Sequence, residues 1–373
     1  MLCAMLMLLG AQDVTPAPAA NQAQVSQLLQ ALERFHFGGY GEIHFDQVSG
    51  TSEKIDLSRF VFYLGYDFAD WIQLHSEVEI EHGFVEADNG EVSVEQLHVD
   101  FLFEPTFNAR VGRFLAPLGI VNQRHEPPSF VGVERPDVET YIVPSTWSMD
   151  GLGGFGALGE DWKYQLYLGS SLSGSGIDPV GGLEEARQEG QPGMSQPALA
   201  GRVDWQPRSD LRTGLGFFAG GLDNGPEGVN PGNDARVAVL CADAQWSTGA
   251  LDFRALYALD WISDADTINP TIASRMDGWY LEGAWHVLPE SSKQGRLADA
   301  DGLLFVRYES LDTQAQMPGG AAADPAGERS ILTFGCSFLP VPNLVLKLDY
   351  QVCDDKTAAG LPERFNLGLG WQF

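Results

Sequence analysis

From Phe35 to the C terminus, hydrophobic and polar residues alternate along the chain with a period of two. In residues 344–352, for example, Leu344, Leu346 and Leu348 alternate with Lys347 and Asp349. Successive side chains of a β-strand point to opposite faces, so this pattern predicts strands with one apolar and one polar face.

The alternation predicts sixteen strands, most of them longer than the five or six residues common in globular sheets. Their length suits strands that cross the hydrocarbon of a bilayer at a tilt, which takes about 9–11 residues. The predicted ranges are 36–47, 57–69, 71–84, 91–104, 107–116, 151–159, 161–172, 197–206, 210–220, 233–247, 249–262, 275–288, 301–312, 327–339, 343–354 and 363–373.

The connections between these strands alternate in length. Tight turns are predicted at 69–70, 104–106, 159–160, 207–209, 247–248 and 340–342. Longer segments lie between them at 48–56, 85–90, 117–150, 173–196, 221–232, 263–274, 313–326 and 355–362, and only 289–300 is long where a turn is expected. Short turns at one end and long loops at the other are typical of outer-membrane barrels, and a soluble sandwich would show no such alternation.

We therefore predict an all-β fold, a transmembrane antiparallel barrel of about sixteen strands. Closure removes both sheet edges, whose unpaired backbone groups would each cost several kcal/mol in hydrocarbon. The apolar face then contacts lipid, and a bore of this width holds water. The sequence contains no run of eighteen uncharged apolar residues, so it predicts no transmembrane helix.

The first residues predict export and a short linker before a barrel over 35–373. Residues 1–11 are apolar and too short to span a bilayer, which indicates a signal peptide within 1–19, cleaved after Ala11 or in the stretch 17–19. Residues 20–34 follow as a periplasmic linker. Helical spacing of Val25, Leu28, Leu29 and Leu32 predicts a short helix there, either periplasmic or the start of a coiled coil.

Composition narrows the possible functions. The chain has 22 Lys and Arg against 51 Asp and Glu, a net charge of −29, which disfavours nucleic-acid binding. The four cysteines form no CxxC pair, and no GxSxG or HExxH motif occurs. We therefore expect no metal, no cofactor and no enzyme activity, although a barrel-embedded hydrolase and a structural or adhesive barrel remain alternatives.

Several segments resemble the family of phosphate-selective porins O and P. They are Gly39–Phe45, Ser58–Phe68, Glu77–His82, Val111–Gly119 and, most strongly, Asn122–Asp137, within residues 35–170. The resemblance implies a sixteen-stranded, trimeric porin of a Gram-negative-type outer membrane with loops folded into the bore. It does not fix the solute, because phosphate-specific members carry dense arginine and lysine rows and this chain has few lysines. We expect passive diffusion of small hydrophilic or ionic solutes.

The 117–150 segment is the longest loop, and its prolines favour an ordered constriction. Its candidate selectivity residues are Arg124, His125, Glu126, Glu134, Arg135 and Asp137. Arg124 and Arg135 facing Glu126 and Glu134 would set up a transverse field. The alternative is that these are solvated loop charges with local ion pairs.

Charged and polar residues of the predicted strands are expected to line the lumen, where charge is solvated; on the lipid face it would cost about 2–4 kcal/mol at mid-depth. They are Arg59, His75, Glu77, Glu79, His98, Asp100, Arg110 and Arg254. The chain ends in Phe373, with Trp371 on the same face. This ending predicts a signal for the barrel assembly machinery; the alternative is a buried last strand of any β protein.

Overall fold

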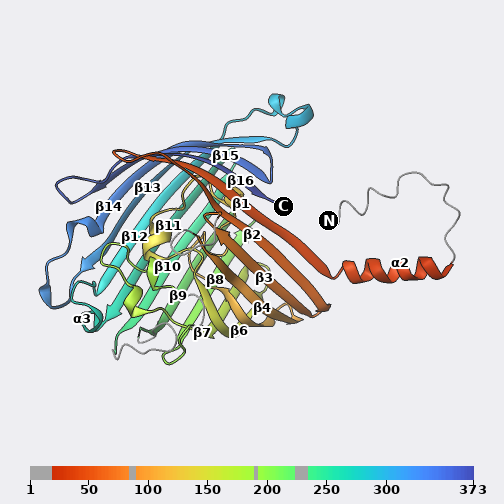
Figure 1. The fold of residues 1–373 in the computed structure, drawn as a ribbon, viewed down its shortest axis with the longest axis horizontal. Helices are drawn as coiled ribbons and strands as arrows, with labels where there is room; N and C mark the ends of the chain where they lie inside the picture. Colours follow the sequence, from red (N-terminus) through yellow and green to blue (C-terminus); the bar gives the residue numbers. More distant parts are fainter. Residues whose placement is uncertain (1–18, 84–89, 189–191, 223–233) are drawn as a thin grey trace.

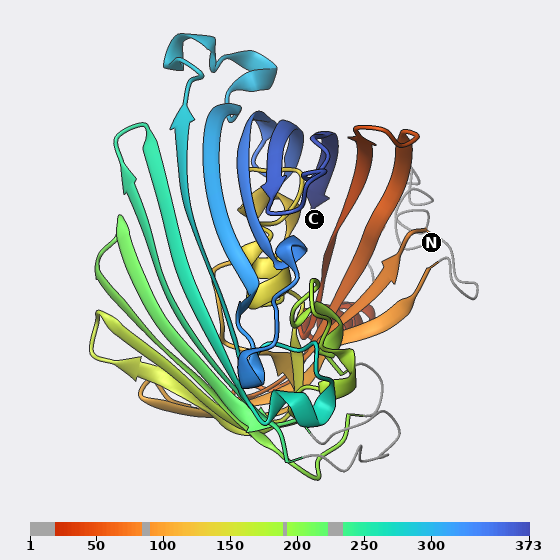
Figure 2. The same cartoon turned by 90° about the vertical axis from the view of Figure 1, so that its left-hand side faces the viewer.

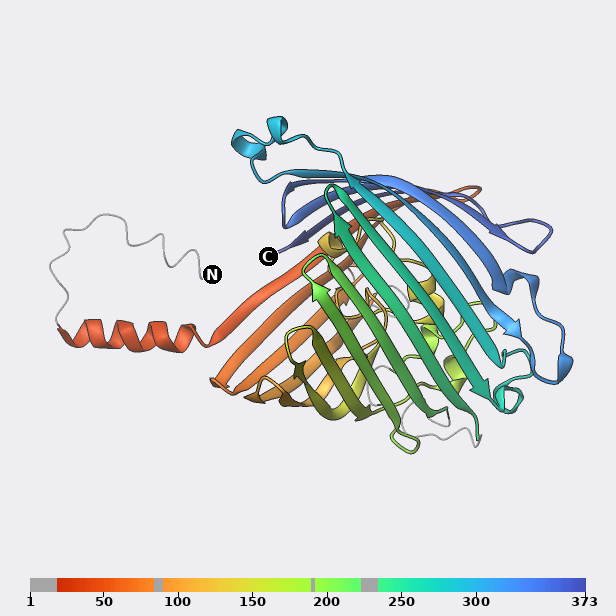
Figure 3. The same cartoon turned by 180° about the vertical axis from the view of Figure 1, so that it is seen from behind.

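The computed structural model describes residues 19–83, 90–188, 192–222 and 234–373. These residues form a closed antiparallel barrel of sixteen strands, each paired with its neighbours in sequence, with β1 paired to β16 (Figures 1 and 3). The prediction of the fold class is confirmed.

The strands are β1 Phe35–Val48, β2 Lys54–Ala69, β3 Ile72–Glu81, β4 Val92–Glu104, β5 Phe107–Leu115, β6 Ser148–Leu158, β7 Trp162–Gly169, β8 Ala198–Arg208, β9 Leu211–Gly221, β10 Arg236–Thr248, β11 Leu251–Ser263, β12 Arg275–His286, β13 Asp301–Gln316, β14 Glu328–Val341, β15 Leu344–Asp355 and β16 Arg364–Gln372. All sixteen predicted strands are found. The largest difference in a strand end is four residues, at Gln316 instead of 312.

Helices are few and short in the described part of the chain. They are α2 Ala19–Leu32, α3 Ala265–Ile268, the π-helical turn η2 Val138–Ile142, and the 3-10 turns η1 Pro127–Ser129, η3 Gly174–Gly176, η4 Glu184–Ala186, η6 Glu290–Ser292, η7 Gly295–Leu297, η8 Pro318–Gly320 and η9 Pro325–Gly327. The α2 helix occupies the predicted linker and projects from the barrel (Figure 1). None of these helices is long and apolar enough to span a membrane. The predicted signal peptide lies mostly outside the described residues.

The two faces of the sheet differ as the alternation predicts. On β12, Trp279 and Leu281 point outward and are 36% and 57% exposed, whereas Tyr280 and Glu282 point inward and are buried. Large apolar side chains are also exposed on the outer face of other strands, including Leu346 and Leu348 on β15. Such an outer surface is suited to lipid and not to water.

Aromatic side chains gather at the end of the barrel that carries the short turns. Each lies within a few residues of a turn: Trp71, Phe103, Phe107, Trp162, Trp205, Trp246 and Phe253. Several contact one another across neighbouring strands, with ring centroids 5.8 Å apart for Trp162 and Trp205 and 5.7 Å for Trp246 and Phe253. Aromatic girdles of this kind mark the membrane–water interface of outer-membrane barrels.

The last strand closes the barrel against the first. Phe373 and Gly39 exchange two backbone hydrogen bonds of 2.8 and 3.0 Å. The rings of Trp371 and Phe373 both approach Phe60 on β2, with centroids 6.5 and 6.4 Å away. The predicted terminal motif therefore lies at the seam, and its role in assembly stays a prediction.

Candidate functional site

The segment 116–147, which joins β5 to β6, folds into the lumen (Figure 2, yellow). Its buried apolar side chains pack against inward-facing residues of the wall, in one cluster that includes Leu118, Ile142 and Trp147 of the loop and Phe218 and Tyr280 of the wall. The rings of Trp147 and Phe218 are 4.6 Å apart. We call this segment the constriction loop.

A buried carboxylate fixes the base of the constriction loop. One oxygen of Glu139 accepts the backbone N–H groups of Ile120 and Val121 at 2.8 and 2.7 Å, and the other accepts the Tyr280 hydroxyl of β12 at 2.6 Å. Gly119 has φ +69°, and a Cβ there would collide with the Glu139 carboxylate. The turn that brings the loop back on itself therefore requires glycine at this position.

The constriction loop also touches the opposite wall, so it crosses the lumen. The carbonyl of Gly132 accepts a hydrogen bond from Lys347 Nζ at 2.7 Å. The backbone N–H of Val133 donates to Asp349 Oδ2 at 2.6 Å. Both wall residues lie on β15, far around the barrel from β5 and β6.

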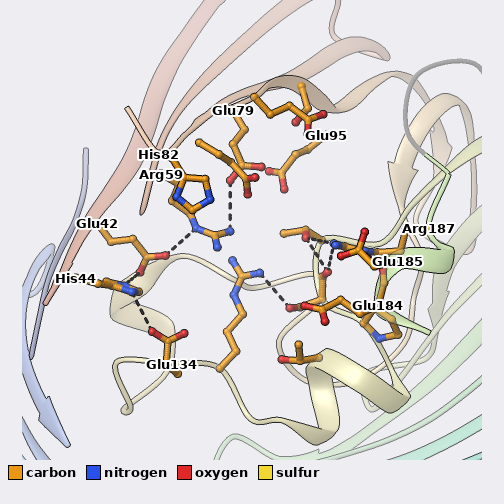
Figure 4. Close-up of a pocket in the computed structure, with 18 of the residues that line it drawn as sticks. Glu42, His44, Arg59, Glu79, His82, Glu95, Glu134, Glu184, Glu185 and Arg187 are labelled. Atoms are coloured by element: carbon orange, nitrogen blue, oxygen red, sulfur yellow. Dashed lines mark hydrogen bonds and ion pairs between the residues drawn. The ribbon is translucent and has the colours of Figure 1, made fainter. Parts of the chain in front are cut away.

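On one side of the loop lies a polar cavity of about 1130 Å³, the vestibule, shown in Figure 4. Its wall carries a chain of ion pairs: Glu134 of the loop contacts His44 at 3.0 Å, His44 contacts Glu42 at 3.2 Å, and Glu42 contacts Arg59 at 2.7 Å. Arg59 also contacts Glu79 at 3.3 Å. The predicted residues Glu134, Arg59 and Glu79 are thus joined in one network.

Arg135 extends into the vestibule without an acidic partner among the described residues. Its Nη1 donates to Ser145 Oγ at 3.0 Å, and its Nη2 is buried without a hydrogen-bond partner there. Burial and the nearby charge of Arg59 lower the pKa of Arg135 below its usual value. In a chain with 51 acidic residues, Arg135 thus places a positive charge without an acidic partner among the described residues at the vestibule.

Arg124 and Glu126 lie on the other side of the loop. Arg124 lines a second cavity of about 510 Å³ together with Arg110 and Arg212. Glu126 lines a third cavity of about 410 Å³ and accepts the Tyr63 hydroxyl at 3.3 Å. Glu134 and Arg135, in contrast, line the vestibule. The structure therefore does not place the two arginines together opposite the two glutamates, because these four residues line three different cavities.

The remaining predicted loop residues are buried. His125 lies between two wall glutamates, 3.3 Å from Glu77 and 3.5 Å from Glu95. Asp137 lies 3.7 Å from Arg364 on β16. Both loop residues thus hold the loop to the wall.

The predicted wall residues all lie on the lumen side. Arg110 donates two hydrogen bonds of 2.7 and 2.8 Å to the carboxylate of Asp100. The rings of His75 and His98 stack with centroids 5.1 Å apart. Arg254 donates to the Ser129 carbonyl of the constriction loop at 2.8 Å, so it supports the loop as well as lining the bore.

No family model matches the chain. A sequence relative is an uncharacterized protein of Aquifex aeolicus strain VF5, which is 33% identical over 368 residues and is matched over 93% of this chain and 82% of that protein. The chain belongs to the family of this protein.

Solved structures with similar folds are outer-membrane proteins. The outer membrane channel DcaP of Acinetobacter baumannii has a TM-score of 0.61 at 11% identity, covering 91% of this chain and 97% of that chain. A loop deletion mutant of OmpT, an outer membrane protein of Vibrio cholerae, has a TM-score of 0.59 at 11% identity, covering 91% and 99%. The anion-selective porin from Comamonas acidovorans has a TM-score of 0.58 at 12% identity, covering 91% and 99%. The chain therefore has the fold of outer-membrane porins.

Several residues that build the site were not among the sequence candidates. Glu42 and His44 alternate with apolar residues on β1 and could have been selected by the same rule as Arg59. Glu139 was not among the loop candidates, because nothing in the pattern of hydrophobic and polar residues indicates that it is buried. Glu95 was missed because a β-bulge in the pairing of β3 with β4 directs its side chain into the lumen.

Proposed function

We propose that this chain is a porin of the outer membrane, a water-filled channel for passive diffusion of small hydrophilic or ionic solutes. The observation that carries the proposal is the separation of apolar and charged side chains onto opposite faces of the barrel wall. Its outer face is apolar with an aromatic girdle, and its inner face carries charged networks around polar cavities. A soluble barrel would gain nothing from this arrangement, because it exposes large apolar side chains to water.

The constriction loop sets the size and charge of the path. It divides the lumen into the vestibule and the two smaller cavities, so solutes must pass between the loop and the wall. Ten carboxylate side chains and six arginine or lysine side chains line the vestibule. We infer a weak preference for cations, moderated by the unpaired Arg135.

Specific uptake of phosphate is not part of the proposal. The arginines of the vestibule wall are mostly engaged with carboxylates, as Arg59 is with Glu42 and Glu79. A phosphate ion would have to displace these partners to bind tightly. The resemblance to porins O and P is retained as a likeness of sequence, and we expect the solute range to be broader.

Location and assembly follow from the same reasoning. We propose that residues 1–19 direct export, that the barrel assembly machinery reads the strand ending in Trp371 and Phe373, and that the barrel resides in the outer membrane of a Gram-negative-type bacterium. Three copies are proposed to associate, since OmpT of Vibrio cholerae, a structure of similar fold, is described in a trimer form.

Reversal potentials in planar bilayers test the proposal. The purified chain is inserted and its current recorded in a salt gradient, with and without added phosphate. We expect stepwise conductance, a reversal potential displaced weakly toward the cation value, and no block by phosphate. Saturation of the current by micromolar phosphate would contradict the broad solute range, and an inserted barrel without conductance would indicate a structural or adhesive role.

A further inference from the structure

Three potential metal ligands meet where the constriction loop contacts the wall. Glu77 of β3, Glu95 of β4 and His125 of the loop are 2%, 5% and 3% exposed. Their nearest ligand atoms all lie within 4.8 Å of one another. Burying two carboxylates side by side is unfavourable unless a positive charge lies between them.

A β-bulge brings Glu95 into this group. The pairing of β3 with β4 shifts between Glu77 and Val78, which leaves Glu95 as the extra residue opposite them. Glu95 and Gln96 therefore both face the lumen, whereas Val94 and Leu97 on either side face outward. Bulges redirect side chains in this way next to functional sites.

Neighbouring groups orient two of the three ligands. His125 Nδ1 lies 2.9 Å from the Asn122 carbonyl oxygen, so the ring donates its Nδ1 proton there and directs Nε2 at the two glutamates. Gln96 Nε2 donates to Glu77 Oε2 at 2.5 Å, which leaves Glu77 Oε1 facing His125. Metal-binding histidines commonly donate their second ring nitrogen to a carbonyl or carboxylate in this manner.

Glu95 is a buried carboxylate without a hydrogen-bond donor among the described residues. Neither of its carboxylate oxygens accepts a hydrogen bond from any residue that the structure describes, although the side chain is buried and directed at His125. A single proton on Nε2 cannot form a short hydrogen bond to both glutamates. The N–O separations of 3.3 and 3.5 Å match the edges of a tetrahedron with bonds of about 2.0–2.2 Å, which are about 3.3–3.6 Å long.

We propose that Glu77, Glu95 and His125 bind a divalent transition-metal ion of the zinc class, through one oxygen of each glutamate and Nε2 of the histidine. The imidazole favours zinc-like ions over Mg²⁺ and Ca²⁺, which prefer oxygen ligands and higher coordination. Water from the 410 Å³ cavity, which Glu77 and His125 line, would complete the tetrahedron. This inference revises the expectation from sequence that the chain has no metal site.

Two similar groups in the lumen are less suited to a metal. His44 already contacts Glu42 with one ring nitrogen and Glu134 with the other, at 3.2 and 3.0 Å. In the other group, which contains His98, Asp100 is held by the two hydrogen bonds from Arg110. A metal would have to break these pairs, whereas Glu95 loses no hydrogen bond on binding.

The proposed ion would lie at the contact between the constriction loop and the barrel wall. Glu95 lines the vestibule, whereas Glu77 and His125 line the 410 Å³ cavity, so the ion would lie in the partition between them. It would tie the constriction loop to β3 and β4. Binding itself does not depend on the proposed porin function and can be measured without any current.

The test is equilibrium dialysis of the EDTA-treated full chain in detergent against Zn²⁺, with metal content measured per chain. We expect one Zn²⁺ per wild-type chain, binding more than about 100-fold weaker in Glu95→Gln and His125→Gln, and wild-type binding in the control His98→Gln. Co²⁺ in the same site should show the intense visible absorption of tetrahedral coordination, absent in Glu95→Gln.

Glu95→Gln is the decisive variant, because Glu95 makes no hydrogen bond whose loss could unfold the barrel. Folding of each variant is checked by heat-modifiable mobility on detergent gels. The absence of stoichiometric Zn²⁺ in the wild-type chain would overturn the proposal. Undiminished binding in folded Glu95→Gln, or loss of binding in His98→Gln, would also overturn it.

Discussion

The anchor of the constriction loop at Glu139 allows a sharp prediction for Glu139→Ala. The variant removes an acceptor that serves two backbone N–H groups and the Tyr280 hydroxyl. Hydrogen bonds to charged groups contribute about 1.5–3 kcal/mol each, and the buried donors would be left unsatisfied. Allowing for non-additivity, we expect docking of the loop to weaken by about 4 kcal/mol or more, which is about a thousandfold in its equilibrium constant.

Single-channel recording measures this effect, because an undocked loop no longer divides the lumen. Glu139→Ala should give a larger and noisier conductance than the wild-type chain. Tyr280→Phe, which removes one of the three hydrogen bonds, should lie close to the wild type. Limited trypsin digestion gives a second readout, since cleavage after Arg124 requires the loop to leave the wall.

The barrel itself should remain intact in Glu139→Ala, because its strand pairing does not involve this side chain. Heat-modifiable mobility checks this. A folded Glu139→Ala barrel with wild-type conductance and wild-type resistance to trypsin would refute the assignment of Glu139 as the loop anchor.

Three further predictions concern the lipid face, the vestibule and the proposed metal. Leu281→Arg, in the middle of an outward face, should destabilise the barrel in a bilayer by about 2–4 kcal/mol in urea unfolding, whereas Leu297→Arg in the 287–300 connection should change it by less than about 0.5 kcal/mol. Arg135→Ala should move the reversal potential toward the cation value, and Arg208→Ala at a short turn should not; equal shifts would exclude a selectivity role. Although burial opposes it, the flanking glutamates raise the pKa of His125 to about 10, so a metal ion must displace its proton at neutral pH. Apparent Zn²⁺ affinity should therefore rise about tenfold per pH unit from about pH 6 to about pH 7.5, and pH-independent affinity would contradict binding through His125.

The strands could be predicted because the bilayer imposes a simple rule on them. Residues 344–352 alternate strictly, and β15 is found there with its leucines outward and Lys347 and Asp349 inward. The loop at 117–150 was also predicted, and the structure places it at 116–147. The local pattern was sufficient in both cases, because the polarity of each residue indicates whether it faces lipid or water.

Contacts inside the lumen could not be predicted in the same way. Val133 meets Asp349 across 216 residues of sequence, and that proximity depends on the closure and tilt of the whole barrel. The bulge at Glu95 shifts the alternation by one residue, which no period-two pattern reveals. One signal was available: Leu256 on β11 is apolar but faces inward, which indicates that another segment covers it.

Ion conduction by the purified wild-type chain tests the central claim most directly. The account predicts discrete current steps that grow with salt concentration when the chain is added to a planar bilayer, because it proposes that solutes pass between the constriction loop and the wall. A barrel that inserts, keeps its heat-modifiable mobility and carries no current would contradict it.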